Sequence, residues 1–273
     1  MIRNETFILS SGLTIPKIGY GTWQIKNEDA PRLVKEAIQC GYRHIDTAIG
    51  YNNEIGVGEG IRASGIKRED LFITSKIPDF VKSYEEAKQC IENSLKRLGL
   101  EYLDLMLIHT PRPWDLLWDK NAHQYYEENV AVYKAMEEAY EAGKLKHIGI
   151  SNFQIHDIEN ILANCKIKPH VNQICVFIGE TPFGLIEYCK DKGILVEAYS
   201  PVGTGRLLKN ERVIEMANKY GVSVAQLGIR YCLELGTLPL PKSSSLSHME
   251  NNLDVDFEIQ DKDMKLLKEM TQY

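Results

Sequence analysis

Short apolar runs alternate with longer amphipathic stretches along the whole chain. The runs have the length of buried strands, and the stretches between them repeat their apolar positions with the period of a helix. We therefore expect strands that are covered on both faces and connected by helices. Eight runs follow one another: KIGYG at 17–21, RHID at 43–46, LFITSK at 71–76, LDLMLIH at 103–109, HIGIS at 147–151, HVNQI at 170–174, ILVEAY at 194–199 and TLPLPK at 237–242.

Helix signals lie between these runs. Ser83 with Glu86 three residues later predicts a capping box, and the helix that it opens should end at Gly99. Ser223 with Gln226 repeats the pattern. Parallel strands need helical crossovers, and eight strand and helix pairs within about 250 residues are typical of a closed barrel. We predict an α/β protein, a (β/α)8 TIM barrel, with residues 1–273 forming a single domain.

The N-terminal segment predicts a further feature of the barrel. Two short apolar stretches, FILS and TIP, flank Ser11 and Gly12, a pair typical of a tight turn. We expect an N-terminal β-hairpin that caps the bottom of the barrel.

Composition and charge exclude several classes of function. The net charge of −6 is spread over interspersed acidic and basic residues, so we expect no nucleic-acid partner. No run approaches the ~18 apolar residues that would span a bilayer, and the apolar part of MIRNETFILSS is too short for a secretory signal. The six cysteines form no CxxC pair, and the histidines show no metal-ligand spacing. We expect a cytoplasmic monomer without a metal.

Polar residues end the buried runs. Asp46 interrupts one run, and Tyr51 follows five residues later. In a parallel barrel the carboxyl ends of the strands form the face that carries active sites, so these side chains should converge. An acid, a lysine, a histidine and a tyrosine on one rim form an acid/base group, and burying them without function would be costly. The residues at the run ends are Asp46, Lys76, His109, Ser151, Asn152, Gln173, Tyr199 and Lys242.

A set of motifs resembles the aldo-keto reductase family in order and spacing. These are GTW at 21–23, HIDTAIGYNNE, ITSKI at 73–77, LMLIHTP at 105–111, GISNF at 149–153, VNQI, AYSPVG at 198–203 and LPKS at 240–243. The resemblance implies the same barrel and an enzyme that moves hydride from NADPH to an aldehyde or ketone. It places Asp46, Tyr51, Lys76 and His109 at the catalytic positions. Lys76 would then lower the pKa of Tyr51, the proton donor, Asp46 would hold Lys76, and His109 would orient the carbonyl.

The resemblance also implies a cofactor site and a substrate pocket. The nicotinamide carboxamide would meet Ser151, Asn152 and Gln173, and its ring would stack on Tyr199. Ser200 and Val202 would face the pyrophosphate, while Lys242 and Ser243 would receive the 2′-phosphate. The full cofactor set is Thr22, Asp46, Ser151, Asn152, Gln173, Tyr199, Ser200, Val202, Lys242, Ser243, His248 and Asn252, and the substrate set is Trp23, Tyr51, His109 and Trp114.

Several positions depart from the family pattern. Thr110 and Pro78 stand where aromatic rings are common, which predicts a wide pocket. Residues 175–177 read Cys-Val-Phe instead of Glu-Tyr-His, which leaves open how Gln173 is held. His248 replaces an arginine at the 2′-phosphate, so we expect NADPH to be preferred less strongly and NADH to be an alternative. The sequence ends at Tyr273 without the long C-terminal segment of many family members, and in this it resembles the bacterial type of the family.

Other functions fit the sequence less well. Gly56, Gly58 and Gly60 resemble a dinucleotide loop, but their GxGxG spacing within a predicted helix, after a polar segment, argues against a Rossmann site. The sequence offers no other reason for them. A non-catalytic nicotinamide-binding barrel acting as a sensor or regulatory subunit would not need all four catalytic residues. A phosphate-site isomerase, or an aldolase with a Schiff base on Lys76, would leave Tyr51 idle.

Overall fold

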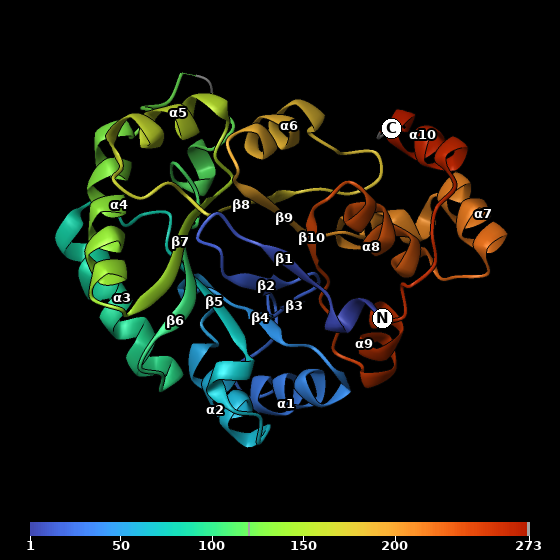
Figure 1. The fold of residues 1–273 in the computed structure, drawn as a ribbon, viewed down its shortest axis with the longest axis horizontal. Helices are drawn as coiled ribbons and strands as arrows, with labels where there is room; N and C mark the ends of the chain where they lie inside the picture. Colours follow the sequence, from blue (N-terminus) through green and yellow to red (C-terminus); the bar gives the residue numbers. More distant parts are fainter. Residues whose placement is uncertain (120, 272–273) are drawn as a thin grey trace.

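The eight apolar runs form one parallel sheet that curls into a barrel (Figure 1). The computed structural model describes residues 1–119 and 121–271. Along the sheet the strands follow their order in the chain, as the predicted α/β TIM barrel requires. The strands are β3 Tyr20–Gly21, β4 His44–Asp46, β5 Phe72–Ile77, β6 Leu103–Ile108, β7 Leu145–Ser151, β8 Val171–Cys175, β9 Leu195–Tyr199 and β10 Leu238–Leu240.

The first and last strands meet through two glycines. The amide of Gly19 donates to the carbonyl of Pro239 at 3.1 Å, and the amide of Gly21 donates to that of Pro241 at 3.0 Å. A Cβ on Gly19 would lie 2.5 Å from Leu240 Cδ2 and 2.7 Å from His44 Nδ1. A side chain at this position would therefore displace the side chains of Leu240 and His44.

Helices surround the strands on the outside (Figure 1). The predicted caps are present: Ser83 Oγ accepts from the amide of Glu86, Gly99 ends that helix with a φ of 66°, and Ser223 and Gln226 form a capping box. The α-helices are α1 Ala30–Cys40, α2 Glu54–Ala63, α3 Tyr84–Leu98, α4 Tyr126–Glu141, α5 Ile155–Asn164, α6 Phe183–Asp191, α7 Glu211–Tyr220, α8 Val224–Glu234, α9 Leu246–Leu253 and α10 Asp261–Glu269. The 3-10 helices are η1 Ile2–Asn4, η2 Ile49–Tyr51, η3 Arg68–Asp70, η4 Trp114–Leu116 and η5 Gly203–Lys209.

The three glycines of α2 serve close packing between helices. A Cβ on Gly58 would lie 2.0 Å from the carbonyl oxygen of Leu98, the last residue of α3. On the other side, a Cβ on Gly60 would lie 2.8 Å from the carbonyl of Pro31 in α1, and one on Gly56 would lie 2.2 Å from the carbonyl of Asn27. These glycines let α2 approach both neighbours, which explains the motif without a nucleotide.

The N-terminal hairpin closes the bottom of the barrel, as predicted. Strand β1 Thr6–Ile8 pairs antiparallel with β2 Thr14–Pro16. Leu9 and Ile15 are buried in one apolar cluster with Phe72 and Leu238, which lie at the beginnings of β5 and β10. The opposite end of the barrel, where the strands finish, is left for the polar residues of the site.

Two further observations concern the described part of the chain. All six cysteines are free thiols. Among the described residues, no helix combines the length and the apolar character needed to cross a bilayer.

Candidate active site

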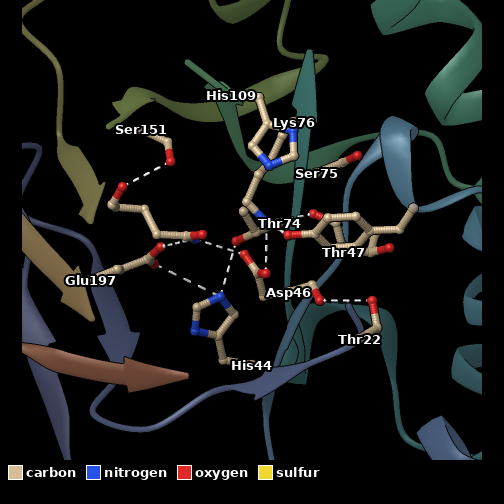
Figure 2. A network of polar contacts seen from close by, with 12 residues as sticks. Thr22, His44, Asp46, Thr47, Thr74, Ser75, Lys76, His109, Ser151 and Glu197 are labelled. Atoms are coloured by element: carbon tan, nitrogen blue, oxygen red, sulfur yellow. Dashed lines mark hydrogen bonds and ion pairs between the residues drawn. The ribbon is translucent and has the colours of Figure 1, made fainter. Parts of the chain in front are cut away.

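Three adjacent strands bring Asp46, Lys76 and His109 together at the carboxyl end of the barrel (Figure 2). Asp46 ends β4, Lys76 lies near the end of β5, and His109 directly follows β6. Lys76 Nζ donates to Asp46 Oδ1 at 2.7 Å, to the carbonyl of Thr47 at 2.9 Å and to Tyr51 Oη at 3.3 Å. All three hydrogens of the ammonium group are therefore used.

Tyr51 reaches this group from the short helix η2, which follows β4. A buried side chain, Asn53, holds the segment: its Nδ2 donates to the carbonyls of Thr22 at 2.9 Å and Ile25 at 3.0 Å, and its Oδ1 accepts from Thr47 Oγ1 at 2.8 Å. Asn53 was not among the residues expected at the site. An asparagine between a turn and a helix gives no sign that it will be buried.

The charges of the site follow from burial and from the Asp46 carboxylate. Burial alone would lower the pKa of Lys76, but the Asp46 carboxylate and the Tyr51 oxygen reverse this effect and raise the pKa, so Lys76 stays an ammonium. Burial raises the pKa of Tyr51, and Lys76 opposes that rise. Lys76 thus acts on the tyrosine pKa in the expected direction, but burial outweighs it, so the pKa of Tyr51 is raised on balance.

His109 is a neutral imidazole beside the tyrosine. Burial, followed by the charge of Lys76, lowers the pKa of His109 to about 3. Its ring lies edge-on to that of Tyr51, with centroids 5.7 Å apart, and to that of Trp114, at 5.5 Å. Within residues 1–119 and 121–271 neither ring nitrogen has a hydrogen-bond partner. A substrate oxygen can thus accept a hydrogen bond from the ring N–H of His109.

The residues expected at the nicotinamide lie on or just after the next three strands. Ser151 ends β7, Asn152 follows it, and Tyr199 ends β9. Asn152 Nδ2 donates to the carbonyl of His109 at 3.0 Å and to Ser151 Oγ at 3.1 Å, while its Oδ1 accepts from Tyr199 Oη at 2.8 Å. This cluster is therefore joined to the catalytic group. The amides and hydroxyls both donate and accept, as a carboxamide ligand requires.

The side-chain amide of Gln173, on β8, is held by two carboxyl groups. Its Nε2 donates to Asp46 Oδ2 at 2.8 Å and to Glu197 Oε2 at 2.7 Å. The partners come from β4 and β9, so the unusual residues 175–177 are not needed to hold the amide. Glu197 was not among the expected site residues, although an acidic residue within the apolar run ILVEAY could have indicated a buried polar contact.

The residues expected at the phosphates lie on segments that follow β9 and β10. Ser200, with a φ of 53°, and Val202 are half-buried before η5. Lys242 is exposed, and its Nζ donates to Ser244 Oγ at 3.0 Å. A lysine beside several hydroxyls, just before helix α9, is a donor set that suits a phosphate. The remaining expected residues are Ser243, buried before α9; His248, exposed on α9; Asn252, buried on α9; and Thr22, whose Oγ1 donates to the carbonyl of Asp46 at 3.0 Å.

Exposed aromatic rings lie on the loops that follow the strands. Trp23 is 47% exposed and Trp114 is 45% exposed, as residues lining an open pocket would be. Two rings that the sequence analysis did not single out, Phe80 and Trp118, are 72% and 76% exposed. Thr110 is buried, with its hydroxyl donating to the carbonyl of Arg112.

Comparisons with known proteins agree with this geometry. The model of the Aldo/keto reductase family matches residues 17–272. A glyoxal reductase of Bacillus subtilis is 42% identical over 262 residues, which cover 95% of this chain and 90% of that protein. A crystal structure of an aldo/keto reductase from Brucella melitensis matches with a TM-score of 0.89 at 36% identity, covering 97% of this chain and 98% of that one. A Bombyx mori aldo-keto reductase in complex with NADP matches with a TM-score of 0.86 at 33% identity, covering 97% and 92%.

Proposed function

The chain belongs to the aldo/keto reductase family, and on this basis we propose roles for its site residues and a class of substrate. The protein is an NADPH-dependent oxidoreductase that reduces aldehyde or ketone carbonyls to alcohols. When bound, NADPH supplies the hydride. The protein must supply a proton and stabilise the negative charge that develops on the carbonyl oxygen.

The observation that carries this function is the buried contact between Lys76 and Tyr51. Tyr51 donates its phenolic proton to the carbonyl oxygen, which becomes the alcohol. The phenolate left behind is stabilised by the Lys76 ammonium 3.3 Å away. Asp46 keeps that ammonium charged and fixed, because its carboxylate lies 2.7 Å from Nζ in a site that excludes water.

His109 orients the carbonyl as a neutral hydrogen-bond donor. Its low pKa argues against an imidazolium as the proton source, so the proton comes from Tyr51. The exposed rings of Trp23 and Trp114 form the walls of the substrate pocket.

The cofactor lies across the rim formed by the strand ends. Ser151, Asn152 and Gln173 bind the carboxamide, and Tyr199 stacks on the nicotinamide ring. Ser200 and Val202 face the pyrophosphate, and Thr22 and Asp46 belong to the same proposed cofactor set. Lys242 and Ser243 bind the 2′-phosphate, with His248 beside it and Asn252 at the adenine. Because His248 replaces an arginine, NADH is accepted as a weaker alternative to NADPH.

We further propose that the protein works as a single-domain monomer in the cytoplasm. One chain supplies every residue of the proposed site, and the six free thiols suit a reducing compartment. The net charge of −6 disfavours nucleic acid as a partner. Size-exclusion chromatography with light scattering measures the oligomeric state, and a dimer mass would contradict the monomer.

Reactive small aldehydes are the proposed substrates, with broad tolerance of larger carbonyls. Glyoxal is the first substrate to test, because a relative that is 42% identical is a glyoxal reductase. Thr110 and Pro78 stand where rings are common, and the rings present are exposed, so few contacts should immobilise a small substrate and KM should be high.

The test follows NADPH oxidation by its absorbance with glyoxal, methylglyoxal, glyceraldehyde, keto acids, sugars and steroid-like ketones. Reduction of several aldehydes by the wild type, and of none by Tyr51→Phe, supports the proposal. Binding of NADPH without turnover of any carbonyl would instead support the sensor alternative. Low-micromolar KM for one small aldehyde without activity on larger ones would contradict the wide pocket.

A further inference from the structure

A second carboxyl group lies beneath the catalytic residues, inside the barrel (Figure 2). Glu197 is fully buried on β9, directly opposite Gln173 in the register of β8 and β9. Gln173 Nε2 bridges the two acids, with Glu197 Oε2 at 2.7 Å and Asp46 Oδ2 at 2.8 Å. Glu197 is thereby linked through one amide group to the aspartate that holds Lys76.

This bridge fixes the orientation of the Gln173 amide. An amide nitrogen has two hydrogens, and here each has a carboxyl oxygen as acceptor. The reverse orientation would place the amide oxygen against the Asp46 carboxylate, with no hydrogen between them. The amide oxygen of Gln173 is therefore the atom left to accept a hydrogen bond from a ligand.

We propose that Glu197 is a positioning residue for this reaction. It holds the Gln173 amide with its oxygen free for the cofactor carboxamide, and as a neutral acid it does so without placing a second negative charge beside Asp46. This inference rests on the proposed function of the site. The role requires Glu197 to stay protonated at neutral pH.

Burial and Asp46 favour the neutral form of Glu197 and outweigh the opposing effects of Gln173 and Lys76. The groups that face Glu197 are Asp46 and His44 from β4, Lys76 from β5 and Gln173 from β8, while the neighbouring residues of β10 are apolar. Burial and then the Asp46 charge raise the pKa of Glu197 to about 8. His44 Nε2 lies 3.9 Å from Glu197 Oε1, but burial lowers the pKa of His44 to about 3, so this pair is not an ion pair at neutral pH.

The neutral acid keeps the charges in the network balanced. Lys76 then faces one carboxylate, that of Asp46, at 2.7 Å. Ionisation of Glu197 above about pH 8 would add an unpaired negative charge to the same buried network. This charge disfavours the phenolate that forms when Tyr51 gives up its proton, so kcat should fall as Glu197 ionises.

Three variants separate these roles. Glu197→Gln keeps a neutral acceptor for Gln173 and cannot ionise, whereas Glu197→Leu removes the acceptor. Glu137→Gln is the matched control, because Glu137 is also a buried glutamate but lies on helix α4 and accepts from the backbone amides of residues 166 and 167 instead of from a site residue. Dissociation constants for NADPH are measured by fluorescence titration, kcat is measured from pH 6 to 10, and folding is checked by circular dichroism.

We expect Glu197→Leu to raise the Kd for NADPH by about threefold to tenfold, the value of one hydrogen bond. Glu197→Gln should bind NADPH nearly as the wild type does, but its fall in kcat should move to more alkaline pH. Glu137→Gln should change neither quantity. If Glu197→Leu does not fold, the dependence of kcat on pH in Glu197→Gln decides whether the inference holds.

The inference is overturned if kcat of Glu197→Gln falls at the same alkaline pH as that of the wild type and any folded Glu197→Leu binds NADPH with an unchanged Kd. Fluorescence titration of the wild type with NADPH separates failure of this inference from failure of the proposed function. A wild-type protein that does not bind NADPH refutes both, whereas a wild type that binds it and variants that match the wild type refute only the role of Glu197.

Discussion

The ammonium nitrogen of Lys76 lies 3.3 Å from the phenol oxygen of Tyr51, and no part of the lysine side chain is exposed. A buried cation in contact with a phenol stabilises the phenolate more than it would in water, because the surroundings screen the charge weakly. The pair can therefore make a proton available to a substrate even though burial alone raises the pKa of the tyrosine.

Tyr51→Phe should lower kcat by about 10²-fold to 10⁴-fold, the usual worth of a positioned proton donor. The variant keeps the ring and removes only the hydroxyl, so the Kd for NADPH should stay close to that of the wild type. Steady-state kinetics and fluorescence titration measure the two quantities. A variant that retains more than about a tenth of the wild-type kcat would show that another group donates the proton.

Lys76→Met should abolish activity and also destabilise the fold, by about 3–5 kcal/mol, because the Asp46 carboxylate would remain buried without its partner. Adding Asp46→Asn removes that unpaired charge. The double variant should recover stability in urea unfolding and remain inactive. Equal stability of the single and double variants would mean that water or another group already compensates Asp46.

His248→Arg should lower the KM for NADPH several-fold and leave that for NADH unchanged. Arginine binds phosphate through two parallel hydrogen bonds, whereas the exposed histidine can donate only one hydrogen bond from a ring nitrogen. An unchanged KM for both cofactors would show that His248 does not contact the phosphate.

Gly58→Ala should destabilise the protein by about 1–3 kcal/mol, because the new methyl group would collide with the carbonyl of Leu98. Gly184→Ala, within helix α6, is the control: a Cβ there meets nothing within 4 Å, so the change should be neutral or stabilising by up to ~1 kcal/mol. Thermal and urea unfolding compare the two. Equal effects would contradict the packing role of the α2 glycines.

Stability should fall as the pH drops below about 6.5. Burial lowers the pKa of His44 to about 3 and that of His147 to about 4, so the unfolded chain takes up protons between these values and 6.5 while the folded protein does not. The stabilising contribution of each neutral histidine is complete above pH 6.5 and is lost as the pH falls towards the folded pKa. His147→Gln should reduce the loss measured by urea unfolding between pH 7 and pH 5, and an identical loss in this variant would contradict the assignment.

The pattern of the chain alone determined the barrel and most of its rim. Strand and helix periods arise from neighbours a few residues apart, so the eight strands, the caps at Ser83 and Ser223 and the N-terminal hairpin could all be predicted. Polar residues that end buried runs could also be assigned to one face, because parallel strands share a direction. Asp46, Lys76 and His109 do meet there.

Only the tertiary structure decided how these groups interact. Asn53 donates to Thr22, 31 residues away in the chain, and Glu197 accepts from Gln173, 24 residues away. No local pattern indicates which buried polar groups will pair. The net direction of the Tyr51 pKa depends on the balance between burial and the Lys76 charge, both of which exist only in the folded chain. The α2 glycines, likewise, have a reason only where Leu98 and Pro31 approach them, because close contact between helices is set by the packing of the whole barrel.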